Sequence, residues 1–143
     1  MKKICLVLAL VFLLALSACA GRSAATAAAG DPRAEGVTVS DTGEWPVNDY
    51  TEGLPVPSGK VAWTMLDAEH GTCSISVTEL SEEEFKDYQE RLTQAGFSVM
   101  ENVSEAVKGQ SYVSIGTLLS NGEKSLSISY VPDTLTIYIS FEQ

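Results

Sequence analysis

One segment of this 143-residue chain has helical rather than strand periodicity, and it constrains the fold more than any other feature. Its start is marked by Ser81 as N-cap residue and by Glu84 as the capping-box partner three positions later. Its end is marked by Gly96, a residue suited to the left-handed conformation that follows many helices. The apolar residues that share one face are Phe85, Tyr88, Leu92 and Ala95. The pattern predicts one helix over about 82–95, packed by that face onto a sheet.

The segments around this helix alternate between apolar and polar residues, which is typical of strands with one buried face. They are 60–66 and 72–78 before the helix, and 97–103, 110–119, 124–131 and 134–141 after it. An Asn-Gly pair at Asn121 and a proline at Pro132 mark tight turns between the last three segments. The order ββαββββ predicts an α+β fold, in which a single, mostly antiparallel sheet carries one helix on one face as a two-layer sandwich.

A proline-rich segment, residues 45–57, precedes the first predicted strand. Its prolines disfavour both a helix and a central strand. It is either a strap, in which Trp45 and Leu54 cover an end of the core, or an arm that presents Trp45 and Tyr50 to a ligand. We favour the strap, because apolar groups this close to a small domain usually become buried.

The N-terminal residues have the pattern of an export signal. Met1-Lys2-Lys3 and the apolar run from Ile4 to Leu16 match its charged and hydrophobic regions. A retained transmembrane helix is the alternative, but the apolar run is shorter than the roughly 20 residues that span a bilayer comfortably. The following Leu16-Ser17-Ala18-Cys19 resembles the lipobox of bacterial lipoproteins, in which the cysteine is acylated and becomes the first residue after cleavage.

The export signal, the lipobox and the composition that follows them divide the chain into three predicted regions. Residues 1–18 are a lipoprotein signal peptide, residues 19–44 are a lipidated Cys19 and a flexible linker, and residues 45–143 are one small domain with its N-terminal strap. The linker is predicted from its Ala, Gly, Ser and Thr residues, which provide no apolar periodicity. We expect a diacylglyceryl group on Cys19, no other cofactor, and localisation on the extracytoplasmic face of the cell membrane.

The acidic composition excludes several kinds of partner. The chain has 9 basic and 19 acidic residues, and removing residues 1–18 takes away two lysines and no acid, which leaves a net charge near −12. No cluster of Lys and Arg is present to neutralise phosphates, so nucleic acid is not expected as a partner. We expect contact with the membrane through the lipid, and with an envelope protein or a cell-wall component.

Cysteine and histidine provide no reactive site in this sequence. Cys73 would be the last cysteine left in the folded domain, and it alternates with Ile75 and Val77, so we expect a buried, unreactive thiol. His70 is the only histidine, and it lies beside Asp67 and Glu69 in a short turn. Without a second histidine or a facing cysteine, this turn predicts no metal site.

Short motifs along the domain support a distant likeness. These motifs are Trp45-Pro46, Leu54-Pro55-Val56-Pro57, the helix from Phe85-Lys86-Asp87-Tyr88 to Gly96-Phe97, and Leu126 to Tyr130. Together they resemble a domain of lipoproteins from clostridia-like Gram-positive bacteria, over residues 45–141. The strand from Tyr112 to Leu119 departs from that pattern, which more often has an aromatic and polar run there. The resemblance implies a surface location and a similar fold, and it implies no catalytic residue.

The residues of this chain bear on three classes of function. Catalysis is not expected, because nucleophilic and acid–base mechanisms require a histidine, lysine or carboxylate pair placed in a cleft. A glycan- or peptide-binding module would use the strand residues that alternate away from the helix, together with the strap aromatics. Its candidate binding residues are Trp45, Tyr50, Ser74, Ser76, Ser127, Ser129 and Tyr138.

The third class is a non-enzymatic interaction or scaffold domain, whose contact is a sheet edge or the proline-rich strap. This class requires the fewest special residues, so the sequence favours a lipid-anchored interaction domain at the cell envelope. The glycan- or peptide-binding module stays as the alternative.

Overall fold

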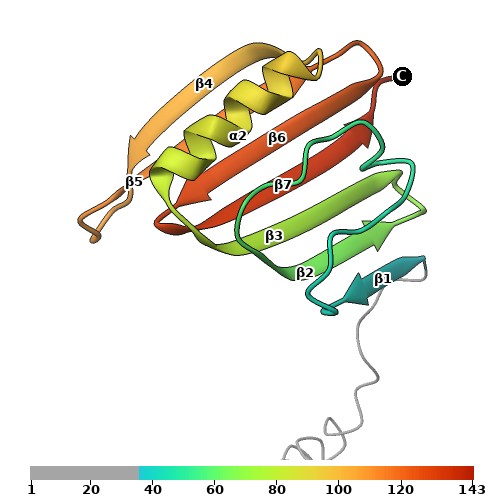
Figure 1. Cartoon of the computed structure of the whole chain (residues 1–143), viewed down its shortest axis with the longest axis horizontal. Helices are drawn as coiled ribbons and strands as arrows, with labels where there is room; N and C mark the ends of the chain where they lie inside the picture. Colours follow the sequence, from blue (N-terminus) through green and yellow to red (C-terminus); the bar gives the residue numbers. More distant parts are fainter. Residues whose placement is uncertain (1–35) are drawn as a thin grey trace, which may run out of the picture. The chain divides into compact units, whose positions relative to one another are not determined.

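Alternating apolar and polar residues build seven strands within residues 36–143, the part of the chain that the computed structural model describes. The strands are β1 (Val37–Ser40), β2 (Lys60–Asp67), β3 (Thr72–Leu80), β4 (Ser98–Ala106), β5 (Val113–Ser120), β6 (Lys124–Val131) and β7 (Asp133–Phe141). The helix of this region, α2 (Glu82–Gln94), follows β3 and precedes β4 in the chain, and it lies across one face of the sheet (Figure 1).

The strands form one antiparallel sheet in the order β1-β2-β3-β7-β6-β5-β4. After β3 the chain crosses the sheet through α2 and reaches the far edge at β4 (Figure 1). It then returns strand by strand until β7 pairs with β3. This path leaves β1 and β4 as the two edge strands.

The predicted single antiparallel sheet with one helix is confirmed, but strands make up a larger share of the described residues than the prediction implied. Within residues 36–143 there are one helix of 13 residues and seven strands, so this region is mostly β. The α+β two-layer description agrees with this arrangement only roughly, because the helical layer is small. None of the helical residues within 36–143 forms a segment long and apolar enough to cross a membrane.

Strand β1 corrects the sequence-based prediction of the linker. Val37 to Ser40 was assigned to the linker over 19–44, but these four residues pair with β2 in register, from Val37 opposite Asp67 to Ser40 opposite Thr64. The prediction was wrong here because four residues with two valines give too short an alternation to indicate a strand. Pairing with β2 stabilises the extended conformation of these residues, which their own sequence favours only weakly. The signal peptide, Cys19 and the linker up to residue 35 lie outside the described residues.

Local signals fix both ends of α2. At the N-terminus the backbone N–H of Ser81 donates to the Glu84 carboxylate at 2.8 Å, and the Glu84 N–H donates to the Ser81 hydroxyl. At the C-terminus the N–H of Phe97 donates to the carbonyl of Leu92 at 3.1 Å, with Gly96 at φ +98°. The predicted capping box and glycine-dependent termination are therefore confirmed, and the helix ends within one residue of its predicted end.

The core lies between α2, the strap and one face of the sheet. The helix contributes Phe85, Tyr88 and Leu92, all fully buried, whereas Ala95 is exposed and does not extend the stripe as predicted. The sheet contributes Cys73, Ile75, Val77, Leu80, Leu119, Leu126, Ile128, Tyr130, Leu135, Ile137 and Ile139. Phe85 stacks on Tyr130 with ring centroids 5.0 Å apart.

The proline-rich segment lies on the same side of the sheet as α2 (Figure 1). Leu54 is buried in the core, and Trp45 and Tyr50 are half-buried against it. The Tyr50 ring lies 5.0 Å from the ring of Phe141. These positions are those expected of a strap. Trp45 also lines a surface depression of about 400 Å³ formed by the strap itself.

Candidate functional site

Strand β4 is an edge strand with an open side. Among residues 36–143 it pairs only with β5, and all nine of its residues are exposed. Its outer edge therefore presents backbone N–H and C=O groups that have no strand partner in the described part of the chain. Such an edge can accept a further strand.

A β-bulge at Met100 determines which β4 side chains face which side. Val99 pairs with Leu119 and Glu101 pairs with Leu118, so two positions on β4 correspond to one step on β5. After the bulge, Asn102 and Ser104 face the α2 side of the sheet. Glu101, Val103 and Glu105 face the other side, called the open face below because no helix or strap of the described residues covers it. Met100 itself is 65% exposed.

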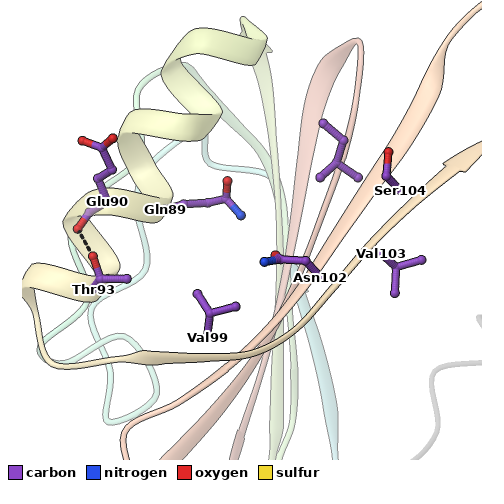
Figure 2. A pocket seen from close by; sticks show the side chains of 8 residues that line it. Gln89, Glu90, Thr93, Val99, Asn102, Val103 and Ser104 are labelled. Carbon is purple, nitrogen blue, oxygen red and sulfur yellow. Dashed lines mark hydrogen bonds between the residues drawn. The ribbon is translucent and has the colours of Figure 1, made fainter.

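A groove of about 410 Å³ separates α2 from β4 (Figure 2). Its lining residues are Gln89, Glu90 and Thr93 from α2, Val99, Asn102, Val103 and Ser104 from β4, and Ile115 from β5. The lining side chains are polar on α2, whereas β4 contributes both polar and apolar side chains. We call it the α2–β4 groove.

A chain of hydrogen bonds joins the two walls of this groove. Gln89 Nε2 donates to Thr117 Oγ1 at 2.7 Å, and Thr117 Oγ1 donates to Asn102 Oδ1 at 2.8 Å. Thr117 is 3% exposed, so these bonds are shielded from water. Figure 2 shows Gln89 and Asn102 pointing toward one another across the groove. The edge strand is thereby fixed to the helix before any partner binds.

A second depression, of about 270 Å³, lies on the open face beside β4. Its lining residues are Glu101, Val103, Gly116, Thr117, Leu118 and Ser127. It exists because Gly116 has no side chain, and a Cβ added there would meet no atom within 4 Å. Val103 lines both depressions, so they lie on either side of the same strand edge. We call this one the Gly116 depression.

The residues along this edge carry negative charge. Glu101 and Glu105 are exposed on β4, and Glu90 lines the α2–β4 groove. Within residues 36–143 none of these three carboxylates forms an ion pair with a lysine, arginine or histidine. The edge therefore favours a cationic over an anionic partner.

The hydroxyl-rich strand residues proposed from the sequence lie on the open face, but they are unequally accessible. The sheet register aligns Ser74, Tyr138 and Ser127 in one row across three strands. Ser127 is exposed and Tyr138 is 43% exposed, whereas Ser74 is only 7% exposed.

The next row across the same strands repeats this difference. Ser129 is exposed and Ser76 is 6% exposed. The expectation that all four serines line an accessible surface was therefore wrong for Ser74 and Ser76. Both lie on the inner strand β3, where larger residues flank them in the register: Met65 and Tyr138 beside Ser74, and Trp63 and Thr136 beside Ser76.

The open face is also more apolar than the alternation of the strand residues predicts. Trp63, Leu118, Val103 and Val39 are between 37% and 41% exposed on it. Alternation did not identify Trp63, because a register shift between Val61 and Trp63 reverses the side to which it points. Trp45 and Tyr50, grouped with the serines as candidate binding residues, lie on the strap side of the sheet instead.

The titratable residues form no reactive cluster in the described part of the chain. His70 is exposed in the turn between β2 and β3, and its Nδ1 lies 2.8 Å from Asp67 Oδ2, a contact that raises the pKa of the imidazole. Cys73 is fully buried as predicted, and burial raises the pKa of its thiol. Within residues 36–143 no group of three His, Cys, Asp or Glu residues is placed to hold a metal ion.

Protein-family models and curated proteins provide no match for this chain. The resemblance to the clostridial lipoprotein domain remains an expectation. The arrangement of the chain's own residues is therefore the basis for inferring a function. Of the two edge strands in the described part of the chain, β4 is the longer, with nine residues against four in β1.

Proposed function

We propose that this protein is a lipid-anchored, non-enzymatic interaction domain on the extracytoplasmic face of the cell membrane, and that it binds an extended segment of an envelope protein along β4. The observation that supports this proposal is an edge strand of nine exposed residues, paired on one side only. A segment added there gains affinity from main-chain hydrogen bonds, and specificity from pockets for alternate side chains. The α2–β4 groove and the Gly116 depression are two such pockets on opposite sides of the edge.

The other edge strand is a weaker candidate for the same role. Strand β1 has four residues, against nine in β4. At about 3.3 Å per residue, β4 offers an edge of roughly 30 Å and β1 less than half of that. The hydrogen bonds between Gln89, Thr117 and Asn102 also hold β4 to the helix. Strand β4 is therefore already in place, and it loses little conformational entropy when a partner binds.

The proposed anchor is a diacylglyceryl group on Cys19, without any further cofactor. Two acyl chains on one residue give lasting attachment, since each buried methylene contributes about 0.8 kcal/mol. In cells that produce the protein, Cys19→Ala is expected to leave the precursor unprocessed or to release the protein from membranes. Normal processing with unchanged membrane retention would exclude the lipid anchor.

Site-specific photocrosslinking in those cells tests the binding edge. A photoreactive amino acid at Met100, 65% exposed on β4, is expected to capture one envelope protein. The same group at Val47, 97% exposed on the strap, is the matched control and is expected to capture none. Equal capture from both positions, or capture only from Val47, would contradict the proposal.

A glycan- or peptide-binding module on the open face is the second candidate. The exposed rings of Trp63 and Tyr138 favour it, because aromatic faces stack on sugar rings. The burial of Ser74 and Ser76 removes half of the serine hydroxyls on which this candidate depended. Binding to cell-wall material that disappears with Tyr138→Ala would support this candidate, and binding that survives the substitution would count against it.

A further inference from the structure

We infer that the segment bound along β4 has the pattern basic–x–apolar–x–basic, with the basic and apolar side chains on the open face. This inference rests on the proposed function, since it assumes that the partner adds as a strand. The side chains that β4 and β5 place on the two sides of the edge determine which residues of a partner fit there.

The two outer positions of the pattern follow from the charges on β4. Glu101 and Glu105 point to the open face, with Val103 between them. Side chains of an added strand alternate in the same way, so its residues i and i+4 lie opposite the two carboxylates. Opposite charges that face each other across paired strands stabilise the pair, and like charges destabilise it. Lysine or arginine therefore fits both positions.

The central position follows from the Gly116 depression. Residue i+2 of the added strand lies opposite Val103, beside the space of about 270 Å³ that Gly116 leaves open. The exposed side chains of Val103 and Leu118 give this space an apolar wall. An aliphatic side chain such as valine would bury these groups, so we assign an apolar residue to i+2.

The two remaining positions point into the α2–β4 groove. Residues i+1 and i+3 would lie opposite Asn102 and Ser104, facing Gln89, Glu90 and Thr93 across the groove. These polar groups offer hydrogen bonds and require no apolar side chain. The pattern is therefore set by the open face, and residues such as threonine fit the groove positions.

A second copy of this chain is a poor occupant of the edge. Antiparallel pairing of two β4 strands about Val103 would place Glu101 of each copy opposite Glu105 of the other. Two such contacts between like charges disfavour the pair, as does the net charge near −12 that each chain carries once residues 1–18 are removed. The favoured occupant is a basic segment of a different protein.

Synthetic peptides test the pattern against the full chain in lipid nanodiscs. The reference peptide has the core Lys-Thr-Val-Thr-Lys, and the comparison peptides have Glu-Thr-Val-Thr-Glu and Thr-Lys-Val-Lys-Thr. The last one keeps the composition of the reference but moves its lysines to the groove side. We expect the reference peptide to bind about tenfold more tightly than the acidic peptide, and severalfold more tightly than the shifted peptide, whose lysines face only Glu90 in the groove instead of Glu101 and Glu105. Equal binding by the reference and the acidic peptide would overturn the inference.

Two variants of the protein locate the effect. E101K/E105K is expected to reverse the preference in favour of the acidic peptide, whereas E44K/D49K, with the same net charge on the strap side, is expected to leave it unchanged. G116V is expected to fill the Gly116 depression and weaken the reference peptide severalfold. Its thermal unfolding midpoint is expected to be no lower than that of the wild type, because a Cβ at this site meets no atom within 4 Å and valine favours a strand more than glycine does. Unaltered peptide binding by a folded G116V, or a reversed preference in E44K/D49K, would contradict the inference.

A backbone-modified peptide separates this inference from the proposed function. N-methylation of alternate residues on the edge that faces β4 removes main-chain donors and keeps every side chain. If binding survives this change, strand addition fails and the inference fails with it. If N-methylation abolishes binding while the lysine positions make no difference, strand addition holds and the inference alone is wrong.

Discussion

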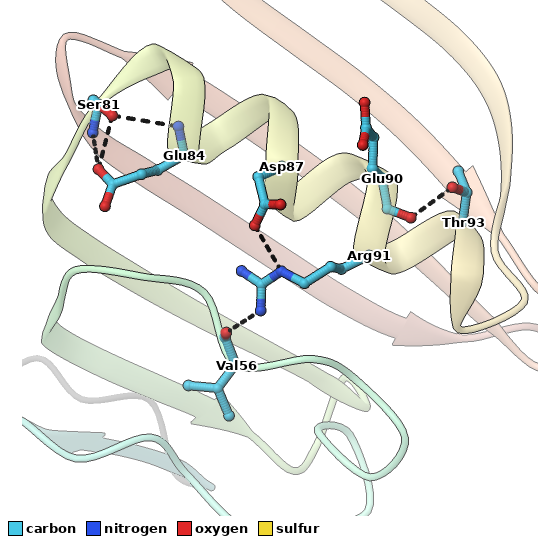
Figure 3. Close-up of polar contacts among 7 residues, drawn as sticks. All are labelled: Val56, Ser81, Glu84, Asp87, Glu90, Arg91 and Thr93. Carbon is cyan, nitrogen blue, oxygen red and sulfur yellow. Dashed lines mark hydrogen bonds and ion pairs between the residues drawn. The ribbon is translucent and has the colours of Figure 1, made fainter.

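Arg91 Nη1 on α2 donates a hydrogen bond of 2.9 Å to the backbone oxygen of Val56 in the strap (Figure 3). The Nε of the same side chain donates to Asp87 Oδ2 at 2.9 Å, one turn earlier on the helix. Arg91 therefore connects two segments that are 35 residues apart and that cover the same face of the sheet. The strap depends on the helix for part of its position.

Replacing this arginine is expected to loosen the strap. Arg91→Gln should lower the free energy of unfolding by about 1–2 kcal/mol, because a charge-assisted hydrogen bond to the Val56 carbonyl is lost. Denaturant unfolding measures the change. Asp87→Asn is the matched control, since it removes only an exposed ion pair and should cost less than about 0.5 kcal/mol. Equal losses in both variants would show that the contact with Val56 adds nothing.

Tyr88 has a buried hydroxyl group that finds no hydrogen-bond partner among the described residues. Burial raises the pKa of this phenol well above its ordinary value. Tyr88→Phe keeps the ring and removes the unpaired group, so the free energy of unfolding should rise by about 1 kcal/mol. Tyr138→Phe, at an exposed hydroxyl, should change it by less than about 0.5 kcal/mol. A loss of stability in Tyr88→Phe would indicate that the hydroxyl is hydrogen-bonded after all.

Gly59 precedes β2 with φ +93°, and a Cβ there would lie 2.5 Å from the carbonyl oxygen of Thr78. Gly59→Ala should therefore lower the free energy of unfolding by about 2 kcal/mol or more, through both the clash and the left-handed backbone. Gly122 has a similar φ of +83° with no atom within 4 Å of an added Cβ. Gly122→Ala should cost only about 1 kcal/mol. Thermal unfolding compares the two, and equal losses would exclude the close approach at Gly59.

The Asp67–His70 contact predicts a pH dependence. The backbone N–H of His70 lowers the pKa of Asp67 below its ordinary 3.8, and the Asp67 carboxylate raises the pKa of His70 above its ordinary 6.5. The contribution of His70 to the free energy of unfolding is complete below pH 6.5 and is lost as the pH rises through the raised pKa of His70. The contribution of Asp67 to the same free energy is complete above pH 3.8 and is lost as the pH falls through the lowered pKa of Asp67. Their mutual stabilisation is therefore largest between about pH 4 and 6.5.

Asp67→Asn tests this window. Because His70 is the only histidine, its imidazole signals in an NMR titration are unambiguous. We expect the pKa of His70 to return toward 6.5 in this variant. The stability difference from the wild type should be largest between about pH 4 and 6.5 and should shrink at higher pH. A His70 pKa that does not respond to Asp67→Asn would exclude the contact.

The sequence was most informative where neighbouring residues determine the structure. Ser81, Glu84 and Gly96 predicted both ends of α2 because a capping box and a left-handed C-terminal residue are local interactions. The strands that follow were predicted from their alternation and turns, with β6 given its observed bounds. Strand β1 was not predicted, because its four residues become a strand only through pairing with β2.

The candidate site depended on information that no local pattern contains. The bulge at Met100 decides that Glu101, Val103 and Glu105 share the open face, and the sheet order places β4 at an edge although β4 lies in the middle of the chain. The hydrogen bonds that join the two walls of the α2–β4 groove run from Gln89 on α2 through Thr117 on β5 to Asn102 on β4. No local sequence pattern predicts that residues of these three elements meet.

The sequence by itself therefore determined the helix, most strands, the acidic charge and the expectation of a lipid-bearing Cys19, because each depends on residues close together in the chain. Only the tertiary structure decided which strand edge stays unpaired, which serines are covered and where Gly116 leaves a space. Those properties depend on register and on neighbours from distant strands, and pairing between strands is set by the whole sheet rather than by any one of its segments.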